Sequence, residues 1–134
     1  MTRRITTLAA VSGMDYEDFG PNERASGVRN GVDFYEEGEG YRRFFDGELR
    51  WGGECRGEVH LDGRVQDREL FVKGEALLFE GTSEDTTDLD GRQELSFSVP
   101  RGDTVTQSAH VTNTDEGSQD YVHWDITVSN NIVE

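Results

Sequence analysis

The stretch Tyr121–Val128, Tyr-Val-His-Trp-Asp-Ile-Thr-Val, alternates strictly between polar and apolar residues. Successive side chains of a β-strand point to opposite faces of the sheet, so this pattern predicts a strand with one face in the core. The stretch 94–99 repeats the alternation, and Val105, Ala109 and Val111 indicate another strand between the two. The carboxyl-terminal third therefore predicts consecutive β-strands.

Turn signals divide the rest of the chain. Two-residue hairpin turns favour Asn-Gly and Asp-Gly, which occur at Asn30-Gly31, Asp46-Gly47, Asp62-Gly63 and Asp90-Gly91. Further turns are expected at Gly52-Gly53, Pro100–Gly102 and Thr112–Gly117. Segments rich in valine and aromatic residues lie between these signals, as in short antiparallel strands.

These patterns predict an all-β fold of about eight antiparallel strands. The expected architecture is a β-sandwich, jelly-roll-like, or else a small barrel. Residues 27–134 are assigned to this domain, whereas residues 1–26 fit the strand spacing poorly and are interpreted as an extended amino-terminal arm. The arm residues expected to mediate assembly are Arg3, Arg4, Ile5, Leu8, Val11, Tyr16 and Phe19.

Charge is the most unusual property of the chain. It has 134 residues, with 28 aspartates and glutamates against 13 basic residues, a formal net charge of −15, and Lys73 as its only lysine. Such a surplus repels itself in dilute buffer, whereas molar salt shortens the Debye length to about 3 Å. The composition resembles that of proteins from salt-accumulating halophiles or their viruses. A GC-rich genome, which favours arginine over lysine, is the alternative interpretation.

The composition also argues against several classes of protein. No basic stripe is available to neutralise phosphates, so binding to nucleic acid is not expected. No apolar stretch approaches the roughly 20 residues of a membrane-spanning helix. The amino terminus lacks the uninterrupted apolar run of a secretory signal, so an unprocessed chain is expected. We expect it on a virion or extracellular surface, or otherwise in a high-salt cytoplasm.

The acidic segment Ser83–Glu94 is the best candidate for a metal site. Hard carboxylate oxygens suit Ca²⁺, and the segment offers Asp85, Asp88, Asp90 and Glu94. The EF-hand register fails, because Phe97 stands where a bidentate glutamate belongs. The alternative is a hydrated loop in a very acidic protein. A second acidic loop, with a weaker claim, holds Asp115, Glu116 and Asp120.

Catalytic candidates are few. His123 and Asp125 share one face of a predicted strand and can bind a transition metal, or act as a base and its orienting group. The alternative is a surface pair. Cys55, the only cysteine, excludes an intrachain disulfide and has no evident catalytic partner. We therefore expect that the protein is not an enzyme and that it binds no cofactor apart from Ca²⁺ at the acidic segment.

Together these features favour a non-enzymatic structural protein. We expect a homo-oligomer that joins other structural subunits, as in capsid decoration, a turret, a tail or a surface assembly. The arm would lie across a neighbour or pair with an edge strand. Two alternatives stay open: a Ca²⁺-dependent carbohydrate-binding or adhesion module that uses Ser83–Glu94, and an acidic mimic of nucleic acid.

Overall fold

The computed structural model describes residues 1–17, 19–114 and 120–133. This part of the chain forms eight β-strands and no helix. The strands are β1 (Arg3–Asp15), β2 (Glu23–Tyr35), β3 (Arg42–Trp51), β4 (Cys55–Gln66), β5 (Glu69–Glu80), β6 (Leu89–Val99), β7 (Thr104–Thr112) and β8 (Tyr121–Ile132).

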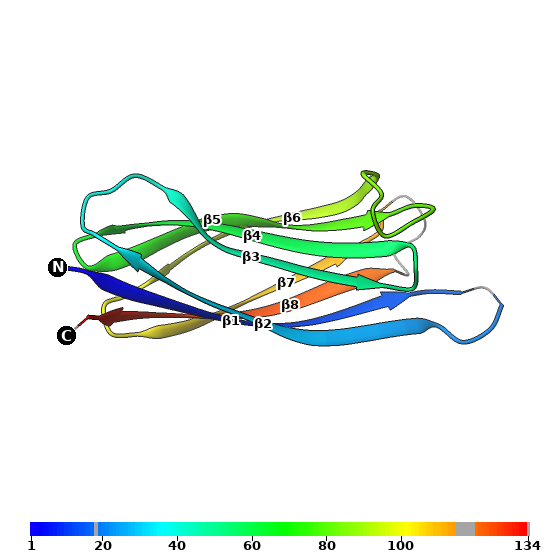
Figure 1. Ribbon diagram of the computed structural model, residues 1–134, viewed down its shortest axis with the longest axis horizontal. Helices are drawn as coiled ribbons and strands as arrows, with labels where there is room; N and C mark the ends of the chain where they lie inside the picture. Colours follow the sequence, from blue (N-terminus) through cyan, green and yellow to red (C-terminus); the bar gives the residue numbers. More distant parts are fainter. Residues whose placement is uncertain (18, 115–119, 134) are drawn as a thin grey trace.

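The strands build two antiparallel sheets of four strands, packed face to face (Figure 1). Sheet A has the order β2-β1-β8-β7, and sheet B has the order β3-β4-β5-β6. The predicted all-β sandwich of about eight strands is confirmed.

The connectivity is simpler than that of a jelly roll. Every hydrogen-bonded pair joins consecutive strands, except the pair between β1 and β8, the first and last strands. The jelly-roll-like order is therefore wrong, because no connection crosses over a neighbouring strand. The sheets meet at two seams: the Arg29 side chain on β2 donates to the Glu48 carbonyl on β3 (2.9 Å), and the His110 amide on β7 donates to the Gln93 side chain on β6 (3.1 Å).

The extended amino-terminal arm is also a wrong prediction. Residues 3–15 form β1, which lies inside sheet A and pairs along its length with both β2 and β8. Ile5, Ala9 and Val11 belong to the core. Alanines, threonines and Gly13 weaken the apolar signal of this strand, but its odd-numbered side chains pack between the sheets.

The alternation near the carboxyl end is confirmed. Val122, Trp124, Ile126 and Val128 point inward from β8 and are fully buried. They pack against inward-facing side chains of sheet B, among them Val59 and Leu61. The core thus forms one layer between the two sheets, as the period of two requires.

The four Asn-Gly and Asp-Gly dipeptides do not form hairpin turns. Residues 30–31, 46–47, 62–63 and 90–91 lie within β2, β3, β4 and β6. Two of these glycines make room for side chains of the opposite sheet instead. A Cβ atom on Gly47 would lie 3.1 Å from the Trp124 ring, and one on Gly31 would lie 3.3 Å from the Phe45 ring. Gly63 is crowded within its own sheet, by Phe44 and Leu70.

The observed turns lie elsewhere. Asp67-Arg68 forms the two-residue turn between β4 and β5, and both residues have positive φ, as in a type I′ turn. The predicted turns at Gly52-Gly53 and Pro100–Gly102 are confirmed as the β3–β4 and β6–β7 connections. The predicted turn Thr112–Gly117 falls partly on residues 115–117, which lie outside the described residues.

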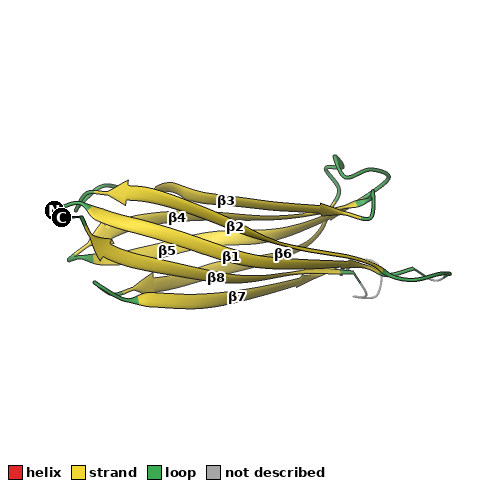
Figure 2. Ribbon diagram, turned by 60° about the horizontal axis from the view of Figure 1, so that its bottom comes forward, coloured by secondary structure: helices red, strands yellow, loops and turns green. Residues whose placement is uncertain are grey.

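The sandwich is elongated, and its two ends differ. Both termini lie at one end, which we call the terminal end, together with the β4–β5 and β6–β7 turns (Figure 1). The opposite end, which we call the distal end, holds the β3–β4 and β5–β6 connections and the β1–β2 hairpin, which projects furthest (Figure 2). The candidate sites lie at these two ends and on the outer face of sheet A.

Candidate functional site

The predicted carboxylates of Ser83–Glu94 do not gather around one point. Asp85 is exposed and forms an ion pair with Arg50. Asp88 is exposed in the β5–β6 connection, Asp90 is buried at the start of β6, and Glu94 lies on the outer face of β6. No three of these four described residues bring ligand oxygens within 4.8 Å of one another. Ca²⁺ binding by this segment stays a prediction.

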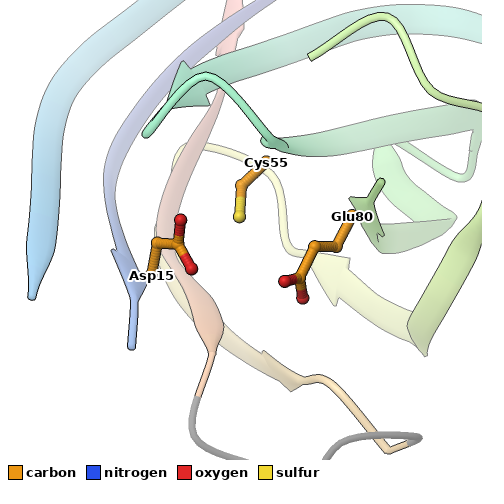
Figure 3. A group of neighbouring side chains, drawn as sticks. All are labelled: Asp15, Cys55 and Glu80. Atoms are coloured by element: carbon orange, nitrogen blue, oxygen red, sulfur yellow. The ribbon is translucent and has the colours of Figure 1, made fainter. Parts of the chain in front are cut away.

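A different group of metal-ligating side chains forms at the distal end. Asp15 ends β1 in sheet A, while Cys55 and Glu80 are directly opposite each other on β4 and β5 in sheet B. Their ligand atoms all lie within 4.8 Å of one another. The three side chains point into a shared space between the sheets (Figure 3). We call Asp15, Cys55 and Glu80 the distal cluster.

The distal cluster is buried and rich in negative charge. Asp15 is only 2% exposed, and its Oδ2 has no hydrogen-bond partner among the described residues. Burial raises the pKa of Asp15 to about 7, and the nearby Asp120 carboxylate adds to the effect. Burial likewise raises the pKa of the Cys55 thiol, with a further contribution from Asp15. The Asn113 side-chain amide donates to Glu80 Oε2 at 2.6 Å.

The terminal end has the opposite character. An open pocket of about 690 Å³ is lined by Arg3, Arg4, Arg68 and Arg101, four of the twelve arginines of the chain. Met1 and Ile132 supply apolar walls. We call this the arginine pocket.

The arginines of this pocket carry charge that is only partly compensated. Arg3 is 1% exposed, and its guanidinium donates to the side chain and carbonyl of Asn130 (2.8 and 3.1 Å). Burial lowers the pKa of Arg3, as do the positive charges of Arg101 and Arg68, while Glu37 acts in the opposite direction. None of the four arginines forms an ion pair within the described residues.

Comparisons with known proteins were made at three levels. No protein-family model, curated protein or solved structure matches this chain. Residues 1–17, 19–114 and 120–133 contain no helix long and apolar enough to cross a membrane.

The outer face of sheet A is nearly free of carboxylates. Directly opposite residues of antiparallel strands share a face, so the pairing defines its members. We call this set the neutral face: the even-numbered residues of β1 from Arg4 to Met14, of β2 from Arg24 to Phe34 and of β7 from Thr104 to Thr112, and the odd-numbered residues of β8 from Tyr121 to Asn131.

Within this set of described residues, Asp125 is the only carboxylate, although 28 of 134 residues are acidic. Leu8, Val28, Val32 and Phe34 expose between 51% and 59% of their surface there. Half of the remaining positions are serine or threonine. The outer face of sheet B is instead covered by ion pairs, which include Arg43–Asp62, Arg50–Glu48, Arg56–Glu58 and Arg92–Glu75.

His123 and Asp125, the pair predicted from the sequence, lie on the neutral face. Their Nε2 and Oδ1 atoms are 3.1 Å apart, as their position on one strand face predicts. The sequence did not predict that His110 lies directly opposite His123, with their Nδ1 atoms 3.1 Å apart. Only the register between β7 and β8 brings the two histidines together.

The residues assigned to the arm separate into different environments. Ile5 and Val11 are core residues, Arg3 and Arg4 line the arginine pocket, and Leu8 lies on the neutral face. The two aromatic residues of this set, Tyr16 and Phe19, are exposed between β1 and β2 at the distal end, Phe19 by 96%.

In the second acidic loop, Asp120 is buried and accepts a hydrogen bond from the Tyr16 amide (2.7 Å), whereas Asp115 and Glu116 lie outside the described residues.

Proposed function

We propose that this chain is a non-enzymatic structural subunit of a larger assembly in a salt-adapted system, such as a virion or a surface layer. In this proposal the neutral face binds the neutral face of a second copy. The observation that carries the proposal is the near absence of carboxylates from the outer face of one sheet, in a protein with a net charge of −15.

The size of the neutral face supports this role. Four strands spaced by about 4.8 Å, with a rise of about 3.3 Å per residue, give a face of roughly 700 Å². Stable interfaces bury about 800 Å² on each partner. Two such faces related by a two-fold axis would thus form an interface of ordinary size.

The charge distribution supports the same partner. Two copies that each carry −15 repel one another, and the repulsion is weakest where carboxylates are absent. Leu8, Val28, Val32 and Phe34 offer apolar surface at that place. Molar salt would screen the remaining repulsion and strengthen the contact.

Mass measurement by analytical ultracentrifugation in dilute and molar KCl tests this proposal. The wild-type chain is expected to form dimers or larger assemblies in molar salt. Val32→Glu places a carboxylate in the face and should weaken association by at least about 100-fold. Gln66→Glu adds the same charge at an exposed position of β4 in sheet B and serves as the matched control.

Two results would contradict the proposal. One is a wild-type chain that stays monomeric in molar salt at high protein concentration. The other is an equal loss of association in Val32→Glu and Gln66→Glu, which would show that added charge matters but the neutral face does not.

The arginine pocket favours a second candidate function, the binding of a small organic anion. Guanidinium groups form bidentate hydrogen bonds with carboxylates and phosphates. Arg4, Arg68 and Arg101 line the pocket, and Met1 and Ile132 can contact an apolar part of the ligand.

Calorimetric titration with citrate and with inorganic phosphate tests this second function. Loss of one charged hydrogen-bonding partner should weaken binding by about tenfold, so Arg68→Gln is expected to show this loss. Arg24→Gln removes the same charge from an exposed position at the distal end and should have little effect. Failure of both anions to bind would exclude this function.

A further inference from the structure

The distal cluster presents an electrostatic problem that the described residues do not solve. Asp15 is only 2% exposed, and no group among the described residues donates a hydrogen bond to its Oδ2 atom. A buried, unpaired carboxylate is strongly destabilising unless a cation or a proton neutralises it. Asp120, Glu17, Glu54 and Glu23 add negative charge around it.

The backbone of Gly52 lies close to the Asp15 carboxylate. Gly52, in the β3–β4 turn, covers this carboxylate: a Cβ atom there would lie 2.8 Å from Asp15 Oδ2 and 2.7 Å from Glu23 Oε2. Gly52 also has a positive φ, which disfavours any other residue. The backbone therefore approaches Oδ2 without supplying a hydrogen bond to it.

The donor set identifies the class of cation. Cys55 offers sulfur, and Asp15 and Glu80 offer oxygen, with all three ligand atoms within 4.8 Å of one another. Ca²⁺ and Mg²⁺ select oxygen ligands, whereas Zn²⁺ accepts sulfur and oxygen together. We propose that Asp15, Cys55 and Glu80 bind one divalent transition-metal ion of the Zn²⁺ type.

Binding would couple the metal to the packing of the sandwich. Asp15 comes from sheet A, while Cys55 and Glu80 come from sheet B, so one ion ties the sheets together at the distal end. Asn113 holds Glu80 in place through its 2.6 Å hydrogen bond to Oε2. On binding, the Cys55 thiol loses its proton to solvent, and the thiolate forms the metal–sulfur bond.

Thermal unfolding and calorimetric titration of the full chain with Zn²⁺ test the site. We expect one equivalent of Zn²⁺ to bind, and the melting temperature to rise by roughly 5–10 °C at Zn²⁺ concentrations about 100 times Kd. Ca²⁺ at the same concentration should leave the melting temperature almost unchanged. Co²⁺ should give the near-ultraviolet sulfur-to-cobalt absorption of a thiolate ligand.

The variants Asp15→Asn and Cys55→Ser conserve shape and remove a ligand. Each should lose the Zn²⁺-dependent rise, and Cys55→Ser should lose the cobalt absorption, while circular dichroism confirms that both are folded. Asp88→Asn, which removes an exposed carboxylate of the β5–β6 connection, is the matched control and should bind Zn²⁺ like the wild type.

Three results would overturn the proposal. The first is the absence of a Zn²⁺-dependent rise in the wild type. The second is an equal rise in Asp15→Asn and Cys55→Ser, which would assign binding to other carboxylates. The third is loss of binding in Asp88→Asn, which would place the ion in the acidic segment Ser83–Glu94.

Discussion

Gly57 shows how closely the two sheets approach. It lies inside β4, and an added Cβ atom would stand 2.5 Å from Val122 Cγ2 on β8. Gly57→Ala should therefore lower the free energy of unfolding by about 1–3 kcal/mol, the usual cost of overpacking. Urea denaturation measures this loss. Gly40→Ala is the control, since nothing lies within 4 Å of its added Cβ and its φ is not in the left-handed region.

A double variant tests whether the clash with Val122 is the cause of the lost stability in Gly57→Ala. Val122→Ala alone leaves a cavity in the core, but together with Gly57→Ala it removes the clash. The two changes should then destabilise the protein by less than the sum of their separate effects. Additive effects would show that Gly57 is required for another reason.

His60 on β4 makes stability depend on pH. Burial lowers its pKa, but hydrogen bonds to Asp46 and Glu58, with the charges of both, outweigh burial, so the folded-state pKa is raised. Glu75, opposite His60 on β5, pairs with Arg92. A raised folded pKa stabilises the protein fully below the unfolded value of about 6.5, and this contribution is lost as pH rises through the folded pKa.

Comparison with His60→Gln isolates this contribution. The wild type should exceed the variant in unfolding free energy by more at acidic pH than at alkaline pH. A difference that stays constant over this range would exclude a charged His60 as its source. Urea denaturation at a series of pH values provides the measurement.

At the scale of elements, sheet A requires β1 in order to form. It pairs with β2 on one side and β8 on the other, and it contributes Ile5, Ala9 and Val11 to the core. A chain that lacks residues 1–26 loses all of β1 and the start of β2, so it should not fold. Far-ultraviolet circular dichroism and amide chemical-shift dispersion report the outcome. A folded truncated chain would restore the interpretation of this segment as an arm.

Elements with strict alternation could be predicted from the sequence, and the others could not. In β8 each inward position from Val122 to Val128 holds a large apolar residue, so the period of two is visible. β1 instead places threonine, alanine and glycine at inward positions, and at Gly13 the Trp51 ring fills the space of the missing side chain. The turn predicted at Gly47 of β3 is wrong for a similar reason. Glycine is needed there because of the Trp124 ring of the opposite sheet, which the local sequence does not contain.

The candidate sites, like the strands, could be predicted only where the sequence pattern is local. His123 and Asp125 could be placed on one face because they belong to one strand. The distal cluster could not be found, because it depends on β1 being a strand and on the register between β4 and β5. Negative charge pointed to Ser83–Glu94 instead, where sequence proximity does not bring the carboxylates around one point.

At the scale of the whole molecule, negative charge is distributed unevenly. The distal end gathers Asp15, Glu80 and Asp120 around one buried space, whereas four arginines line the pocket at the terminal end. The neutral face extends between the two ends along sheet A. Attraction between the arginines of one end and the carboxylates of the other is too weak to offset the repulsion that a net charge of −15 produces. Repulsion between carboxylates therefore dominates wherever salt does not screen it.

Stability should therefore rise with salt. The Debye length falls from about 10 Å at 0.1 M to about 3 Å at 1 M, which removes most of the repulsion between exposed carboxylates. Melting temperatures measured from dilute buffer to molar KCl should increase by several degrees. Sucrose stabilises folded proteins by exclusion from their surface and does not screen charge. If the melting temperature rose with sucrose but not with KCl, repulsion between carboxylates would not limit the stability of this fold, and the excess of acidic residues would need another explanation.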